Sequence, residues 1–239
     1  MSKILKAVQK SRQGLDLSQQ LGTLGYKNVF PPPDAEQQLE FEQLANNLIN
    51  LQNGDEGIAI TFCSTARNEG SSFVSFNTAR YISLILDKHV AWIDANFVSP
   101  QKIVTQDSVD FRSLLMQPEL LDNEVTTTQF TVIPHGDRHI KQTDYLLGPN
   151  YRALLKACAS RFAYTIIDAP ATSASIDAGH IARSTFGLVV VVEAQRLKHE
   201  IIAESIQAQE NSGVNVIGTV LNNRSFEIPS FLYKKMSNL

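Results

Sequence analysis

The sequence is poor in several features that define whole classes of protein. Its 239 residues include only two cysteines, Cys63 and Cys158, too few for a disulfide framework or a cysteine-based metal site. The longest apolar run, residues 186–192, falls far short of the roughly 20 residues that cross a bilayer. The amino terminus also lacks a secretory apolar segment. We therefore expect a cytoplasmic protein in which both cysteines are small core residues.

The chain also has no excess of positive charge. Its formal net charge of −3 gives no general attraction to nucleic acid or anionic lipid, so we expect no nucleic-acid partner. Residues 2–12 are a local exception, because four basic side chains surround a few apolar ones there. This segment is either an amphipathic helix that contacts a membrane or a partner, or a solvated terminal helix, and the sequence leaves both open.

What the sequence does contain is enough apolar residues for one substantial core, at 43% of the chain. Residues 14–33 are interrupted by glycine and proline, which indicates a linker, so an amino-terminal helix and linker are predicted at 1–33. The domain is predicted at 34–225, with a carboxyl-terminal tail at 226–239.

Within this domain, short apolar runs alternate with helical patterns. Strands are predicted at 57–64, 89–94, 130–134, 164–168, 188–192 and 214–221, and helices at 35–51, 73–86, 111–116, 151–162, 176–183 and 197–209. Strands that are apolar on both faces and alternate with helices require a sheet covered on both sides. The pattern predicts an α/β fold with a doubly wound, mostly parallel sheet. Ligands in such folds lie beyond the carboxyl ends of the strands, where Ser64–Ser72, Asp94 and Asp168 should meet.

Several sequence motifs follow one another in a particular order. They are the segment Ser2–Ala7, the helix over Glu40–Leu48, the loop Ser64-Thr-Ala-Arg-Asn-Glu-Gly-Ser-Ser72, the helix start Phe73-Val-Ser-Phe-Asn-Thr-Ala79, the strand ends Asp94-Ala-Asn96-Phe-Val98 and Asp168-Ala-Pro170-Ala171 with Asp177-Ala178, and the last strand end Val220-Leu-Asn222. In this order they resemble the bacterial tyrosine kinase family of exopolysaccharide and capsule synthesis, which is related to the MinD and ParA ATPases. The resemblance covers nearly the whole chain and implies a P-loop nucleotide-binding fold.

The resemblance assigns the loop to the phosphates of ATP or ADP, which backbone N–H groups and a lysine surround in such loops. The implied cofactor-binding residues are Arg67, Asn68, Glu69, Gly70, Ser71, Ser72, Phe73 and Asn222. The lysine position is Ser71 here, so the Walker A motif is degenerate. Losing that charge-assisted contact costs about 1.5–3 kcal/mol, or roughly ten- to a hundred-fold in affinity. Arg67 is either a replacement cation or a solvated loop residue.

Two aspartates match the acidic positions of the same family. The resemblance implies that Asp94 and Asp168 are catalytic and that, together with Ser72, they hold magnesium, which prefers hard oxygen ligands. The second acid of the family is Asn96 in this sequence, and its arginine is Val98. The alternative is that both aspartates only accept hydrogen bonds from the loops that follow their strands.

Two further departures concern self-phosphorylation and assembly. The family's tyrosine cluster near the carboxyl terminus, its own substrate, is reduced here to Tyr233. Its Glu-x-x-Arg-x-x-Arg motif for ring assembly corresponds to Glu40, Gln43 and Asn46, so both arginines are absent. A homo-oligomer is still an option, but not one that depends on those arginines.

These observations predict a catalytically impaired pseudo-kinase, with weakened or absent binding of ATP, ADP and magnesium. The resemblance implies a partner, a membrane-embedded, Wzz-like polysaccharide chain-length regulator. It would hold the protein at the inner membrane, which the chain contacts only through that partner or its amino-terminal helix. One alternative is an active tyrosine kinase that uses Arg67 or a lysine from another chain. Another is a MinD- or ParA-like positioning ATPase.

Overall fold

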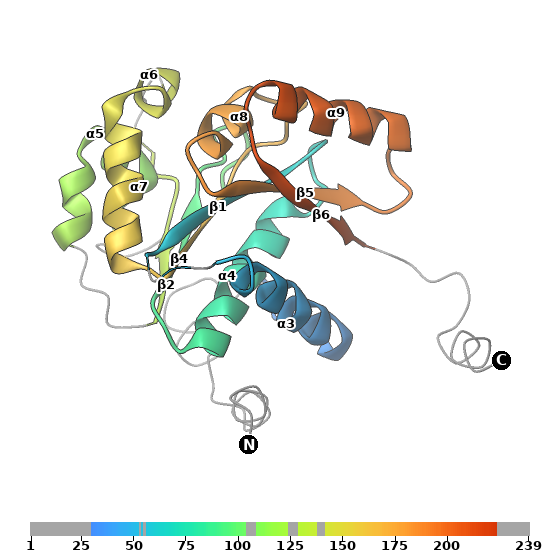
Figure 1. Cartoon of the computed structure of the whole chain (residues 1–239), viewed down its shortest axis with the longest axis horizontal. Helices are drawn as coiled ribbons and strands as arrows, with labels where there is room; N and C mark the ends of the chain where they lie inside the picture. Colours follow the sequence, from blue (N-terminus) through green and yellow to red (C-terminus); the bar gives the residue numbers. More distant parts are fainter. Residues whose placement is uncertain are drawn as a thin grey trace.

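The computed structural model describes residues 30–52, 54, 56–103, 109–123, 129–137 and 142–223, which form a sheet covered by helices on both faces (Figure 1). All six strands of these described residues are parallel, in the order β3-β2-β4-β1-β5-β6. Their bounds are β1 Ile58–Ser64, β2 Val90–Asp94, β3 Phe130–Ile133, β4 Tyr164–Asp168, β5 Gly187–Glu193 and β6 Val216–Asn222. The predicted doubly wound α/β fold is confirmed.

The helices also follow the predicted order. They are α3 Ala35–Ile49, α4 Ser71–Leu86, α5 Phe111–Met116, the 3-10 helix η2 Pro118–Asn123, α6 Gln142–Leu146, α7 Pro149–Arg161, α8 Asp177–Ala182 and α9 His199–Asn211. Asp34 caps α3, because its carboxylate accepts the N–H groups of Glu36 and Gln37, and the side chain of Gln37 accepts the N–H of Asp34. Neither η2 nor α6 was predicted, since each is too short to show a hydrophobic period.

The face of the sheet under α3 and α4 is rich in aromatic residues. Phe30 stacks on Phe76 with ring centroids 4.2 Å apart and meets the edge of Trp92 at 5.4 Å. The indole N–H of Trp92 donates to the hydroxyl of Ser75 at 2.9 Å, so its one polar group is satisfied in the core. Phe30 thus packs on the domain although the sequence placed it in the linker, and the domain boundary at residue 34 stays a prediction.

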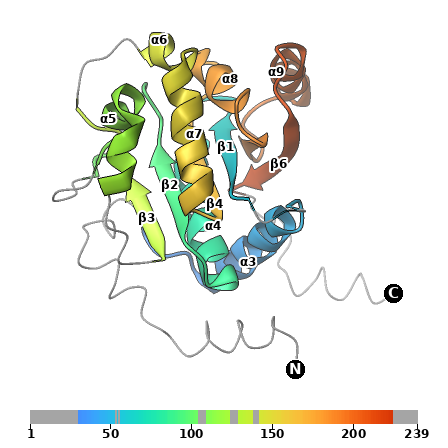
Figure 2. The same ribbon diagram turned by 60° about the vertical axis from the view of Figure 1, so that its left-hand side comes forward.

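The opposite face lies under α5, α7 and α8, and Figure 2 shows α7 running across it. Cys63 and Cys158 are buried free thiols in this core, as predicted. Burial raises the pKa of each thiol to about 12, which keeps both protonated and unreactive.

Several predictions concern residues that are not described. The amphipathic segment at residues 2–12 and the single Tyr233 both lie outside the described residues. Within the described ranges, no helix has the length and apolar character needed to cross a membrane.

Candidate functional site

Three strands end at one edge of the sheet and bring the predicted site residues together. β1 ends at Ser64, β2 at Asp94 and β4 at Asp168, and Asp94 and Asp168 are direct neighbours in the register of the sheet. A cavity of about 270 Å³ opens beside them, lined by the loop residues 67–73 and by Phe30, Asn96 and Gln101 among others. The residues of the loop therefore surround a space that a small ligand can enter.

The backbone of the loop has the shape of an anion-binding site. Asn68 and Gly70 are both left-handed, with φ of 63° and 88°. Gly70 precedes α4 with no side-chain cap, and the first turn of α4 holds no acidic residue, so the partial positive charge of the helix start is not neutralised by its own side chains. The left-handed backbone at Gly70 is strained for other residues, and a Cβ atom there would lie 2.1 Å from Nδ2 of Asn222, whose side chain would have to shift.

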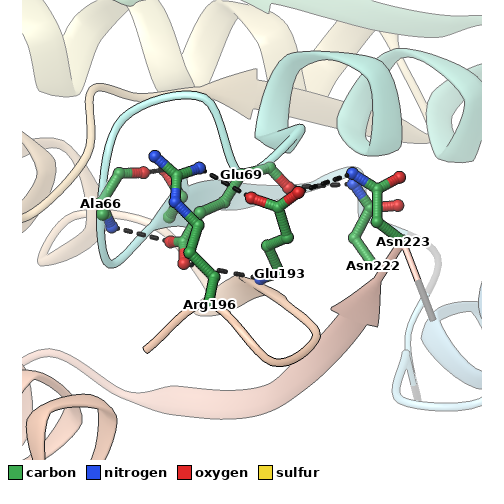
Figure 3. Close-up of polar contacts among 7 residues, drawn as sticks. Ala66, Glu69, Glu193, Arg196, Asn222 and Asn223 are labelled. Atoms are coloured by element: carbon green, nitrogen blue, oxygen red, sulfur yellow. Dashed lines mark hydrogen bonds and ion pairs between the residues drawn. The ribbon is translucent and has the colours of Figure 1, made fainter. Parts of the chain in front are cut away.

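Two of the predicted cofactor-binding residues hold the loop from behind (Figure 3). Glu69 is fully buried, and its carboxylate accepts the N–H of Ala66 at 2.7 Å and that of Glu193 at 3.5 Å. The side-chain amide of Asn222 donates to the carbonyl of Glu69 at 2.9 Å, and Asn222 does not line the cavity. Their polar groups thus fix the loop, and a role in ligand binding stays a prediction.

A second acid near this loop was missed by the sequence reasoning. Glu193 ends β5, where its carboxylate accepts from Arg196 at 2.7 Å and from Asn223 at 3.1 Å (Figure 3). The bond from Asn223, followed by that from Arg196, lowers the pKa of Glu193. Its position at the end of a very apolar strand was the signal available in the sequence.

Asp168 is held by the two serines that begin α4. Its oxygens accept the hydroxyl of Ser71 at 3.0 Å and that of Ser72 at 2.5 Å. Burial, and secondly the charge of Asp94, raise the pKa of Asp168 to about 8, whereas the two hydroxyl bonds oppose this rise. The residue in the lysine position is therefore turned toward the strand-end acid.

Asp94 and Asn96 are engaged by their own loop. The carboxylate of Asp94 accepts the N–H of Asn96 at 3.0 Å and that of Gln101 at 2.7 Å, while burial raises its pKa to about 7. The side-chain oxygen of Asn96 accepts the N–H groups of Val98 at 3.3 Å and Ser99 at 2.9 Å. Asn96 thus forms a side-chain turn at the place of the family's second acid.

The predicted magnesium ligands differ in how they meet the cavity, because Ser72 lines it and the two aspartates lie behind its wall. Asp94 and Asp168 are fully buried and do not line the cavity, and the hydroxyl of Ser72 is directed at Asp168. Among the described residues, no group of three or more histidine, cysteine or acidic side chains is placed to hold a metal. The magnesium assignment of Ser72, Asp94 and Asp168 stays a prediction.

The cavity wall contains one cation and two aromatic rings. Arg67 is exposed and is the cationic side chain of the described lining, and it makes no hydrogen bond or ion pair with any described residue. Phe73, a predicted cofactor-binding residue, also lines the cavity. Phe30 lines it too and was missed, because nothing in a glycine- and proline-interrupted stretch predicts which of its residues packs on the domain.

Comparison with known proteins adds a family resemblance to this geometry. No family model matches the sequence. Tyrosine-protein kinase CpsD of Streptococcus agalactiae serotype Ia is 27% identical over 108 residues, which cover 45% of this chain and 47% of that protein. This chain thus spans less than half the length of the curated relatives it matches.

Solved structures resemble the whole domain. The kinase domain of Escherichia coli tyrosine kinase ETK has a TM-score of 0.71 and 20% identity, covering 86% of this chain and 83% of that one. A ParA family ATPase from Chlorobium tepidum has a TM-score of 0.55 and 16% identity, covering 69% of this chain and 73% of that one. At these identities the structures show the fold alone. Together with the curated relatives, they confirm the predicted resemblance to bacterial tyrosine kinases and the MinD/ParA-like P-loop fold.

Proposed function

We propose that this chain is a catalytically impaired relative of the bacterial exopolysaccharide tyrosine kinases and acts as a regulatory partner in polysaccharide synthesis or export. The similarity to a tyrosine-protein kinase and to the ETK kinase domain supports the kinase-like part of this proposal. The regulatory part follows from the chemistry of the site.

The observation that carries the proposal is the side chain at position 71. Phosphoryl transfer needs positive charge on the outer phosphates, where negative charge accumulates in the transition state. Ser71 offers a hydroxyl in place of an ammonium group, and that hydroxyl donates to Asp168 rather than into the cavity. Binding of a phosphate group to the loop N–H groups survives this change, but fast transfer does not.

A phosphorylation assay tests the proposal that phosphoryl transfer by this chain is impaired. The purified chain is incubated with magnesium and ATP labelled on the terminal phosphate, and tyrosine labelling and phosphate release are measured. We expect both to equal those of a Gly70→Ala variant, whose loop is distorted, after circular dichroism has shown that this variant is folded. Tyrosine labelling of the native chain above this control contradicts the proposal.

The regulatory role has its own test. We propose that the partner is a membrane-embedded chain-length regulator, so removal of this chain is expected to shift the length distribution of the exported polymer. Complementation with the native sequence should restore the distribution. An unchanged distribution in the deletion strain, measured by gel electrophoresis of the polymer, contradicts the role.

One observation favours a working kinase as the second candidate. Arg67 lines the cavity without a partner among the described residues, so its guanidinium group is free to take the place of the lysine. This candidate predicts measurable transfer by the native chain that is lost in Arg67→Gln. It also predicts that Ser71→Lys adds little to the native rate.

A further inference from the structure

One side of α3 is buried and the other is open to solvent. The ring of Phe41 lies 5.7 Å from that of Phe73 and 5.9 Å from that of Tyr81, so this side packs on α4. Leu39 is two positions away from Phe41 and points to the opposite side, where it exposes 57% of its surface. A single exposed leucine is common on protein surfaces, so its meaning depends on the charges around it.

The charges around Leu39 are all negative. Glu36 lies three positions before it on the same stripe of the helix, Glu40 follows it directly, and both are exposed. Residues 30–52 contain four acidic and no basic residues. No ion pair joins these carboxylates to a basic side chain of the described residues. The outer side of α3 is therefore an apolar spot surrounded by negative charge that no described cation balances.

The complementary pattern occurs in residues 2–12, the amphipathic segment of the sequence. This segment contains four basic residues, no acidic residue and the large apolar residues Ile4, Leu5 and Val8. Its formal charge of +4 equals that of residues 30–52 in size and is opposite in sign. Three of its basic residues, at positions 3, 6 and 10, recur at the spacing of one helix face. The segment thus matches the outer side of α3 in both charge and apolar character.

The chain between the two parts is long enough to bring them together. Residues 13–29 separate the segment from Phe30, which stacks on Phe76 just before the start of α3. A flexible chain of these 17 residues has a root-mean-square span of about 20–25 Å. The 15 residues of α3 extend over about 22 Å, so the segment can reach its whole length. Tethering of this kind gives an effective concentration on the order of millimolar, which favours contact within one molecule.

We propose that residues 2–12 dock on the exposed side of α3 in the same molecule, with the lysines on Glu36 and Glu40 and the apolar residues on Leu39. The inference goes beyond the proposed function, because no residue of α3 lines the cavity. Each exposed ion pair changes the docking constant by only about 1.4- to 5-fold, so several pairs and the leucine act together.

Cross-linking in the full chain tests the contact directly. Gln9→Cys is combined with Gln43→Cys, an exposed position one turn after Leu39, and disulfide formation is followed during mild oxidation. The native Cys63 and Cys158 are buried and do not compete. At a protein concentration of about 1 μM, far below the effective concentration of a tethered segment, we expect a cross-link within the monomer. The absence of this cross-link overturns the inference, and so does a cross-link that joins two molecules.

Charge reversal on α3 tests the ionic part of the docking. Glu36→Lys/Glu40→Lys should slow the cross-link about three- to twentyfold, because two ion pairs are lost. Glu200→Lys/Glu204→Lys is the matched control and should leave the rate unchanged. It has the same spacing and the same change of charge, both of its positions are exposed, and Glu200, like Glu36, lies in the first turn of its helix. Equal slowing by the two double variants contradicts the proposal.

The opposite reversal shows whether the segment supplies the cations. Lys3→Glu/Lys6→Glu alone should slow the cross-link by a similar factor. Combined with Glu36→Lys/Glu40→Lys, it should restore at least about half of the native rate, since the pairs form again with exchanged signs. A combined variant that is as slow as either double variant contradicts a direct pairing between the segment and α3.

An anionic membrane is the competing partner for a basic amphipathic segment. The native chain is therefore sedimented with vesicles of equal parts phosphatidylglycerol and phosphatidylcholine. We expect it to stay in the supernatant, because the docked segment has its cations on α3. Sedimentation that is lost in Lys3→Glu/Lys6→Glu would place residues 2–12 on the membrane instead and would overturn the inference.

Discussion

The loop of residues 64–72 and the strand-end acids Asp94 and Asp168 lie at one edge of the sheet, yet they differ in what they leave available to a ligand. The loop keeps the left-handed Gly70 and an uncapped helix start, with Glu69 and Asn222 bonded behind it. Asp94 and Asp168 are instead fully buried, and both oxygens of each accept bonds from the protein. The loop lines the cavity, whereas the acids are buried behind its wall.

This difference teaches that the two halves of P-loop chemistry are separable. Binding depends on backbone N–H groups, whose direction is set by the conformation of Gly70 and by bonds behind the loop. Phosphoryl transfer depends on charged side chains. At position 71 the side chain is a serine, whose hydroxyl donates to Asp168. The following changes test whether the halves are in fact independent, in order of decreasing expected effect.

The largest effect is expected from Gly70→Ala, which alters the backbone of the loop. The new methyl group meets Asn222 at 2.1 Å in a left-handed backbone, so we expect the free energy of unfolding to fall by about 2–3 kcal/mol. Gly213→Ala is the matched control, since Gly213 is also left-handed with a φ of 84° but an added Cβ atom there would meet nothing within 4 Å. It should cost about 1 kcal/mol.

Urea denaturation of both variants measures this difference. The double variant Gly70→Ala/Asn222→Ala should recover part of the loss, because it removes the atom that the methyl group meets. Equal destabilisation at Gly70 and Gly213 would show that the contact with Asn222 does not shape the loop, and the contrast between the two regions would weaken.

The second effect concerns the carboxylate that holds the loop. Glu69→Ala leaves the N–H of Ala66 without its acceptor and should lower the free energy of unfolding by about 1–3 kcal/mol. Glu204→Ala on the exposed face of α9 is the control and should change it by less than about 0.5 kcal/mol. Thermal and urea unfolding measure both. A Glu69→Ala chain as stable as the control would mean that the loop does not depend on this bond.

Much of the fold was predictable because its signals are local or periodic. The alternation of apolar runs and helical patterns predicted the strands, and the parallel-sheet rule predicted that Asp94 and Asp168 would lie side by side. The direction of each polar side chain was not predictable, because it depends on distant partners. Ser71 and Asp168 are 97 positions apart, and nothing near Glu69 in the sequence shows that its carboxylate points inward.

A smaller effect is expected from Ser71→Ala, which changes the surroundings of the strand-end acid Asp168. Removing one hydroxyl donor from Asp168 should lower the free energy of unfolding by about 1 kcal/mol. Ser160→Ala on the exposed side of α7 is the control, because its hydroxyl bonds only to Ala157 within the same helix. A double-mutant cycle of Ser71→Ala with Asp168→Asn isolates the pair, with an expected coupling near 1 kcal/mol. Zero coupling would show that the hydrogen bond from Ser71 to Asp168 does not contribute to stability.

The smallest effect separates two roles of Asn96, which occupies the place of the family's second acid. Its side-chain oxygen accepts two N–H groups, so Asn96→Ala should lower the free energy of unfolding by about 0.5–1 kcal/mol. Asn96→Asp keeps an oxygen acceptor in the same position and should stay within about 0.5 kcal/mol of the native chain. Urea denaturation measures both variants, and an Asn96→Asp chain as unstable as Asn96→Ala would contradict the side-chain turn. A loss of stability in Asn96→Ala alone would show that the acceptor oxygen, rather than the neutral amide group, is what this position contributes to the loop after β2.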